Sequence, residues 1–304
     1  MKRIAPLLVI IAASLWGFDG IILRPALYSL PVPLVVFVET SIVALLLIPV
    51  LLKNFDVIRK LTRREWLSFA GVGLLGGAVG TMAITKALFY VNFVNLSVVI
   101  LIQKLQPVFA LGLAAIILKE KLPKIFFLWA GLAIVGAYFM TFGLNIPNLS
   151  TGDKTIIAAA LSLVAALSFG SSTVLSKLAL KNVGFEVATY LRFLISAIIM
   201  FLVALFTSDL FQISKISETQ WGVFILIAFT TGGAAIFLYY YGLKKISASV
   251  ATICELAFPL TAVVLDYLVR GTVLSIIQWF GVSLLVFSII KVSGVTFSNE
   301  KTNS

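Results

Sequence analysis

Two stretches of the chain match each other and decide the fold. Residues 14–27 read SLWGFDGIILRPAL and residues 167–180 read LSFGSSTVLSKLAL, so that a shift of 153 residues places Trp16 on Phe169. Shifts of 152 or 153 residues also match Arg24 with Lys177, Glu39 with Arg192, Gln103 with Glu255 and Pro107 with Pro259. Because the matches keep the same order in both halves, they indicate an internal repeat.

The composition is that of a membrane protein. Hydrophobic residues make up 61% of the chain and charged residues 12%, and the mean hydropathy is +1.13. A helix of about 20 apolar residues crosses the hydrocarbon layer of a bilayer, and the sequence contains ten such runs. The predicted spans are 5–27, 33–52, 66–89, 94–118, 124–143, 155–180, 185–206, 220–243, 248–269 and 274–293.

Ten helices divide into five plus five at the repeat. We predict two five-helix units, residues 1–150 and residues 151–304. Because five is an odd number, the second unit must cross the membrane in the opposite sense. The predicted fold is therefore an all-α, polytopic membrane protein with a 5+5 inverted-topology repeat, an arrangement that places the substrate near the middle of the membrane between the halves.

Lys and Arg residues are distributed unequally between the two sides. With a cytoplasmic N-terminus, sixteen of them fall on the cytoplasmic side, and Arg24, Lys154, Lys215 and Arg270 fall on the other. This bias predicts a multi-pass protein of the cytoplasmic membrane with both termini in the cytoplasm. The loop positions account for the net charge of +11, so that no nucleic-acid partner is expected.

The residue types that most catalytic sites need are scarce. The chain has no histidine and one cysteine, Cys254, which excludes imidazole acid-base catalysis, Ser/His triads, cysteine metal clusters and an intramolecular disulfide. Asp19 and Asp266 lie far apart and in no recognisable catalytic motif. We expect no enzyme, no cofactor and no metal site. A channel-like or regulatory membrane protein, or an embedded hydrolase with paired aspartates, is the alternative.

The motif SLWGF in the first span and the segment from Pro107 to Glu120 in the fourth, within the five-plus-five pattern, resemble the EamA-type family of the drug/metabolite transporter superfamily. The resemblance covers nearly the whole chain. It implies export or exchange of small metabolites, often amino acids, through a central cavity lined mainly by the third, fourth, eighth and ninth helices. Two positions depart from the family pattern. Arg192 matches the arginine of the second helix of such repeats, whereas Glu39 replaces it in the first repeat, and the second repeat has no acidic equivalent of Glu120.

Charged residues inside the spans predict ion pairs, because an unpaired charge costs roughly 2.5 to 3.5 kcal/mol at the centre of a membrane helix. Residue counts along the predicted helices place opposite charges at matching depths. The predicted pairs are Asp19 with Lys104, Glu39 with Lys86, and Arg192 with Glu255.

Two polar stripes predict a hydrated substrate path. Gln103 and Pro107 share one face of the fourth span, and Glu255 and Pro259 share one face of the ninth. Each proline leaves the carbonyl four residues earlier without its usual N–H donor, and that carbonyl then needs water, a side chain or a ligand. Kinked helices with structural ion pairs and no ligand contact are the alternative.

Aromatic and small residues add three expectations. Trp16 and Tyr240 are candidates for stacking on a substrate, while the membrane-interface belt accounts for at least one of the tyrosines at 239–241. The glycines at 71–80 predict close helix packing, with a sliding surface as the alternative. Glu120, between two lysines, is expected in a solvated loop.

These observations together predict a secondary transporter of a small polar or zwitterionic metabolite, such as an amino acid. Export is implied by the resemblance alone. Glu39 or Glu255 is a candidate proton carrier, although a facilitator needs none. The predicted substrate-path residues are Trp16, Asp19, Glu39, Lys86, Gln103, Lys104, Pro107, Arg192, Tyr240, Glu255 and Pro259.

Overall fold

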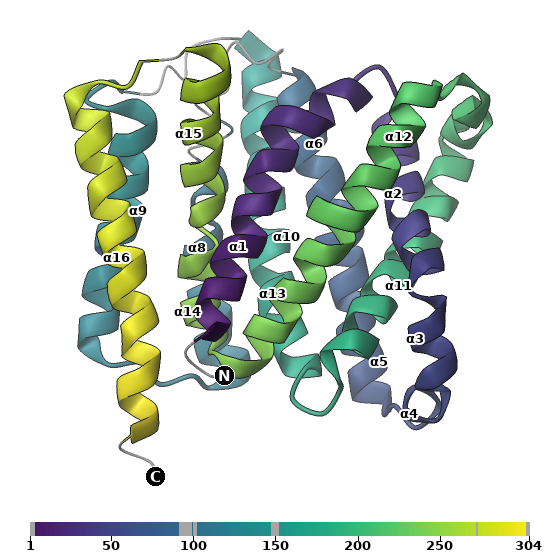
Figure 1. Ribbon diagram of the computed structural model, residues 1–304, viewed down its shortest axis with the longest axis horizontal. Coiled ribbons are helices and arrows are strands. Elements are labelled where there is room, and N and C mark those ends of the chain that lie inside the picture. Colours follow the sequence, from purple (N-terminus) through teal and green to yellow (C-terminus); the bar gives the residue numbers. More distant parts are fainter. Residues whose placement is uncertain (1–3, 91–98, 100–101, 147–151, 272, 302–304) are drawn as a thin grey trace.

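The described part of the chain is helical throughout. The computed structural model describes residues 4–90, 99, 102–146, 152–271 and 273–301, and these contain helices, turns and bends but no strand. Eight stretches among them are long and apolar enough to cross a membrane, and Val32–Leu46 and Gln106–Leu118 are shorter apolar helices. Figure 1 shows the helices standing side by side in one bundle. The predicted all-α class is confirmed for the described residues.

Several of the spans consist of more than one helical segment. In the first half these are α1 (Ala5–Phe18), η2 (Asp19–Leu23), η3 (Arg24–Leu27), α2 (Val32–Leu46), α3 (Ile48–Lys53), α4 (Phe55–Arg59), α5 (Arg63–Val72), η4 (Gly73–Val79), α6 (Gly80–Tyr90), α8 (Gln106–Leu113), η5 (Ala114–Leu118) and α9 (Lys124–Phe142). In the second half they are α10 (Gly152–Ala179), α11 (Phe185–Phe206), η6 (Asp209–Lys215), α12 (Glu218–Ile227), η7 (Ala228–Gly232), α13 (Gly233–Lys245), α14 (Ala248–Cys254), α15 (Ala257–Arg270) and α16 (Ile276–Lys301). The segments η2, η4, η5 and η7 are π-helical, and η3 and η6 are 3₁₀ helices.

The third and eighth predicted spans begin with the same capping motif. Glu65 N–H donates to Thr62 Oγ1 over 3.3 Å, and Thr62 N–H donates to the Glu65 carboxylate over 2.8 Å. Ser217 and Gln220 form the same reciprocal pair at the start of α12. Such a box satisfies N–H groups that the first turn of a helix leaves without partners. The two boxes are 155 residues apart, which adds a structural match to the repeat seen in the sequence.

Both of these spans then widen into a π-helical segment, η4 in the first half and η7 in the second. In η4, Gly76 and Gly77 lie directly against Ser172 of α10 and Ser196 of α11, so that a Cβ atom at either glycine would overlap a serine side chain. Membrane helices approach closely where small residues meet. The prediction that these glycines allow close packing is confirmed.

The fourth and ninth predicted spans are interrupted at matching places. A turn at residues 104–105 precedes α8, and a turn at residues 255–256 separates α14 from α15. Pro107 and Pro259 follow these turns and are buried. A proline lacks the N–H that would continue the helical ladder and its ring crowds the preceding turn, which is why each helix restarts here. The interruption of the helix that each proline predicts is confirmed, and the contact of these stripes with a substrate stays a prediction.

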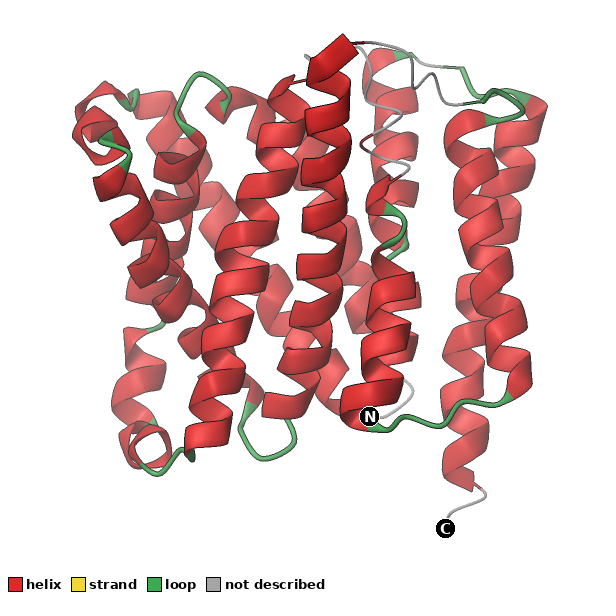
Figure 2. Ribbon diagram, turned by 180° about the vertical axis from the view of Figure 1, so that it is seen from behind, coloured by secondary structure: helices red, strands yellow, loops and turns green. Residues whose placement is uncertain are grey.

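The two halves pack on each other in reciprocal pairs. α1 packs against α13 and α15, and α10 packs in the same way against α6 and α8. α2 packs against α11, and α9 packs against α16. α1 begins at the lower edge of the bundle and α10 at the upper edge, while α16 ends at the lower edge (Figure 1). Figure 2, from behind, shows the start of α1 and the end of α16 on that same edge.

Candidate functional site

The centre of the bundle holds a polar cluster around Glu255. Glu255 lies at the turn between α14 and α15, and its Oε2 accepts a hydrogen bond from Gln106 Nε2 over 2.7 Å. Its Oε1 accepts from the Tyr239 hydroxyl over 2.6 Å and from Thr173 Oγ1 over 3.3 Å. These donors come from α8, α13 and α10. The carboxylate therefore joins α8 of the first half to two helices of the second half, α10 and α13.

An aromatic pair and a free acceptor adjoin this cluster. The Trp16 ring packs on the Tyr239 ring with centroids 5.3 Å apart and a tilt of 58°. Gln103 Nε2 donates to Gln106 Oε1 over 3.3 Å, and the buried Gln103 Oε1 accepts no hydrogen bond within the described residues. Among the predicted site residues, Trp16, Gln103 and Glu255 are thus brought together. Tyr239, a candidate for stacking, and Gln106, on the polar stripe of the fourth span, complete the cluster, although neither is among the predicted substrate-path residues.

The backbone carbonyl of Glu255 is not free for a ligand. Phe258 N–H donates to it over 2.9 Å, because the chain tightens into a turn before α15 begins. Pro259 removes the usual donor to this carbonyl, but the prediction that the carbonyl then needs water, another side chain or a ligand is wrong. The side chain of the same residue supplies the polar group at this point.

Arg192 and Tyr240 lie next to the cluster, on the side of Tyr239. Arg192 Nη1 donates to the Tyr240 hydroxyl over 3.4 Å, and Ser176 Oγ lies 2.8 Å from the same hydroxyl. Tyr240 is fully buried, and its ring lies 5.8 Å from that of Tyr239. In the part of the chain that the structure describes, Arg192 forms no direct ion pair with Glu255. The predicted direct ion pair is thus wrong: Arg192 donates to Tyr240, whereas Glu255 accepts from Tyr239.

A second charged cluster lies at the end of the first span. Arg24 Nε donates to Asp19 Oδ2 over 2.8 Å, and Arg24 Nη2 contacts Glu39 Oε1 and Oε2 over 3.2 and 3.3 Å. The sequence places Arg24 within the first predicted span, 5–27, near the non-cytoplasmic side, and predicts no partner for it. In the structure η2 and η3 carry the helical chain on past Phe18, which brings the guanidinium back towards α2.

The predicted ion pairs of Lys104 with Asp19 and of Lys86 with Glu39 are also wrong. Lys104 is buried and donates to the Ala137 carbonyl over 2.6 Å and to the Thr141 hydroxyl, so that it faces α9 and not Asp19. Lys86 is exposed, and its ammonium lies 6.0 Å from the Tyr90 ring centre. Equal depth in the membrane does not bring two side chains into contact, because the rotation of each helix about its axis decides which neighbour a side chain faces.

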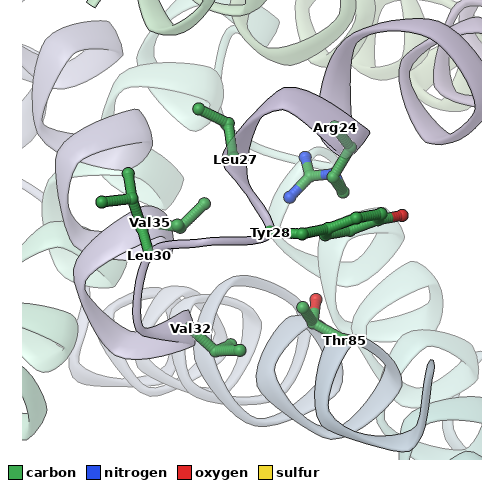
Figure 3. Close-up of a pocket in the computed structure, with 7 residues that line it drawn as sticks. All are labelled: Arg24, Leu27, Tyr28, Leu30, Val32, Val35 and Thr85. Carbon is green, nitrogen blue, oxygen red and sulfur yellow. The ribbon is translucent and has the colours of Figure 1, made fainter. Parts of the chain in front are cut away.

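A small pocket adjoins the Arg24 cluster (Figure 3). Its polar lining comes from Arg24, Tyr28 and Thr85. Its apolar lining consists of Leu27, Leu30, Val32 and Val35. The pocket thus lies at the junction of η3, α2 and α6, beside the charged residues and away from Glu255.

Glu120 links the two halves of the bundle. Its carboxylate accepts hydrogen bonds from Ala248 N–H over 2.7 Å, from Ser249 N–H over 3.1 Å and from Ser249 Oγ over 2.6 Å. These donors belong to the first turn of α14, where N–H groups have no partner within the helix. The prediction of a solvated loop residue is wrong, because Lys119 adopts a left-handed conformation with φ of 55° and turns the chain towards α14.

Tyr241 lies apart from the central cluster. Its ring lies 3.7 Å from the Lys245 ammonium and packs edge-on against Phe185 with centroids 5.0 Å apart. Tyr239, Tyr240 and Tyr241 thus face three different environments. This is consistent with the expectation that consecutive tyrosines on a helix do not share one cavity.

The sequence profile of the EamA-like transporter family matches residues 3–142 and again residues 156–294. The chain belongs to the EamA-like transporter family. The two matches fall on the two halves that show reciprocal packing, so that each half corresponds to one family unit.

Known proteins that resemble this transporter are transporters themselves. The riboflavin transporter ImpX of Fusobacterium nucleatum is 47% identical over 289 residues, which cover 94% of this chain and 96% of its own. The uncharacterized transporter YyaM of Bacillus subtilis is 26% identical over 240 residues, 77% of this chain and 75% of its own. A solved crystal structure shares the fold at 16% identity, with a TM-score of 0.76 over 97% of this chain and 99% of its own.

Proposed function

We propose that this transporter carries riboflavin, or a flat heterocycle of the same chemistry, across the cytoplasmic membrane. The observation that carries the proposal is the junction of the Trp16–Tyr239 ring pair with the hydrogen-bonding groups of Gln106 and Glu255. The high identity to a riboflavin transporter over nearly the full length of both chains supports the same substrate class.

The chemistry of the central cluster suits such a molecule. Riboflavin has a planar three-ring system whose edge carries an N–H group between two carbonyl oxygens, and a polyhydroxylated chain. Aromatic rings pack favourably on one another in offset or tilted geometry. A carboxylate accepts from an N–H, and a carboxamide both donates and accepts. Glu255 and the Gln103–Gln106 pair thus provide complementary groups for the polar edge beside the rings.

We further propose the complete architecture of ten spans in a 5+5 inverted repeat, with units at residues 1–150 and 151–304. Three observations support it: the reciprocal helix packing, the matched capping boxes 155 residues apart, and the matched interruptions of the fourth and ninth spans. A substrate site between inverted halves fits alternating access, in which one half rocks against the other. The loop charges support a cytoplasmic location of both termini.

Counterflow in proteoliposomes tests the transport function. Vesicles containing the purified protein are loaded with unlabelled riboflavin, and uptake of labelled riboflavin is measured. We expect transient accumulation that saturates with concentration. A channel would equilibrate the label without accumulating it. Amino acids, which the family resemblance favours, are tested as competitors, and the initial rates from each side measure the predicted export direction.

Substitution of Trp16 tests the substrate class. An aromatic contact contributes about 0.5 to 1.5 kcal/mol, so that Trp16→Leu should raise the half-saturating riboflavin concentration by about two- to tenfold. Trp221→Leu is the matched control, because Trp221 lies on the exposed side of α12. Counterflow of amino acids without counterflow of riboflavin, or equal effects of the two substitutions, would contradict the proposed substrate.

A further inference from the structure

The Arg24 cluster contains one positive and two negative side chains. Asp19 and Glu39 contact the same atom, Arg24 Nη2, over 2.6 and 3.2 Å. The side chains of the three residues are 9 to 17% exposed. With both carboxylates ionised, the cluster would hold one uncompensated negative charge inside a membrane span, which is unfavourable. Among the described residues, the cluster thus has one positive charge fewer than its two carboxylates need.

The two carboxylates are not equivalent. Asp19 Oδ2 accepts from both Nε and Nη2 of Arg24, over 2.8 and 2.6 Å, whereas both oxygens of Glu39 contact a single nitrogen at longer distances. Asp19 Oδ1 is buried and receives no hydrogen bond from any described residue. A protonated Glu39 would remove the excess charge and would supply an O–H donor next to the same guanidinium nitrogen that Asp19 contacts.

The elements packed against α2 supply no further hydrogen-bond or ion-pair partner to Glu39 among the described residues. η4 and η7, which pack against α2, carry no titratable side chain. Tyr28 lies beside Arg24 in the pocket of Figure 3. On the remaining elements packed against α2, the titratable side chains form no hydrogen bond or ion pair with Glu39 among the described residues. They are Lys53, Lys86, Tyr90, Glu186, Tyr190, Arg192, Asp209, Lys215 and Glu218.

α1 connects this cluster to the central cluster. Asp19 opens the π-helical segment η2, three residues after Trp16, and residues three apart lie on the same side of a helix. Between them, Gly17 lies so close to α15 that an added Cβ atom would be 2.7 Å from the Phe258 carbonyl oxygen. The same helix that carries Asp19 at its end therefore contacts both Tyr239 and the start of α15. π-helical segments are frequent at such functional positions.

We propose that Glu39 is the proton-carrying group of this transporter, holding one proton against Asp19 and Arg24 and releasing it once in each transport cycle. The proton leaves the carboxyl oxygen of Glu39 for water on one side, and a proton from water on the other side restores the neutral acid. This inference rests on the proposed transport function and adds the coupling ion to it. Glu255, whose carboxylate accepts hydrogen bonds from Gln106, Tyr239 and Thr173 that stabilise its ionised form, then serves as a substrate contact.

A gradient experiment tests the coupling. The full-length protein is reconstituted in proteoliposomes with the membrane potential clamped, and a pH gradient is imposed. Wild type should accumulate riboflavin several-fold above equilibrium, whereas Glu39→Gln should lose this accumulation and keep counterflow within about twofold of wild type. Glu186→Gln, an acid in the first turn of α11, is the matched control and should behave as wild type. Accumulation by Glu39→Gln, or by wild type only under a sodium gradient, would overturn the proposal.

A second measurement does not depend on the substrate. Infrared spectra of the purified protein at neutral pH should show the carbonyl stretch of a protonated carboxyl group, and Glu39→Gln should reduce this band. Asp19→Asn should reduce the band as well, because Glu39 then becomes the ionised partner of Arg24. This second variant tests the proposal if Glu39→Gln does not fold. An unchanged band in the folded variant would overturn the proton site. Absence of wild-type riboflavin counterflow would instead overturn the proposed substrate while the infrared result still decided the state of Glu39.

Discussion

Removal of the negative charge at Glu120 should loosen the contact between the two halves. The carboxylate accepts two backbone N–H groups and one hydroxyl from the first turn of α14. In Glu120→Gln, one oxygen remains an acceptor, whereas the other is replaced by an NH₂ group that faces N–H donors. At least one charge-assisted hydrogen bond is therefore lost, and the others become neutral.

The size of the effect follows from these contacts. A hydrogen bond to a charged group contributes about 1.5 to 3 kcal/mol. Glu120 is half-buried, and water can replace part of the lost interaction, so that we expect a loss in the free energy of unfolding near the lower end, about 2 kcal/mol. This lowers the ratio of folded to unfolded protein by roughly 30-fold. For a chain of 304 residues, with an unfolding entropy of about 2.1 cal/mol/K per residue, the midpoint of thermal unfolding should fall by about 3 °C.

Thermal unfolding of the purified protein in detergent measures this change. Glu186→Gln provides the matched control, because it removes the same charge from the first turn of another helix, α11. We expect a shift of 1 °C or less, roughly the size of an ordinary surface substitution. The reasoning is refuted if Glu120→Gln lowers the midpoint no more than Glu186→Gln does.

Two further predictions concern topology and helix packing. Cysteine at Arg59, in α4 at the lower edge of the bundle, should react only with reagents that reach the cytoplasm, and cysteine at Ser29 only from outside; labelling of both from one side would contradict the inverted repeat. Gly17→Ala should lower the free energy of unfolding by about 1 to 3 kcal/mol, because its Cβ would overlap Phe258. Gly20→Ala, with no atom within 4 Å of the added Cβ, should leave stability unchanged or raise it, and equal losses at both glycines would contradict the packing.

Features that depend on a local run or a single residue of the sequence were predictable. Apolar runs of membrane length marked the helices, because a bilayer requires every backbone group to be paired within the segment. Pro107 and Pro259 marked the interruptions of the fourth and ninth spans, since proline acts on its own local backbone. The cluster residues Trp16, Gln103 and Glu255 were also found, because each is a polar or aromatic residue in an otherwise aliphatic stretch.

Side-chain partners were not predictable, because they depend on helix rotation and on irregular backbone. The π-helical turns of η2 shift the register after Asp19, and this change placed Arg24 next to Glu39. Lys104 found a backbone carbonyl, although a carboxylate had been expected. Glu120 required the left-handed turn at Lys119, a conformation that a lysine adopts only at a cost. None of these turns has a sequence signal as strong as a proline.

The repeat gives these irregular details a common explanation. A shift of 153 residues relates Asp19 to Ser172 and Glu39 to Arg192. The same backbone frame thus holds two acids in the first half, where they share Arg24, and a hydroxyl and a base in the second, where Arg192 supports Tyr240 behind the central cluster. Opposite charges at equivalent positions mean that the halves do not have equivalent roles. If Glu39 were only a structural partner of Arg24, one acid would be enough to balance the guanidinium. The second carboxylate destabilises the resting cluster unless a proton accompanies it, and this requirement is the reason to look for coupling in the first half of the chain.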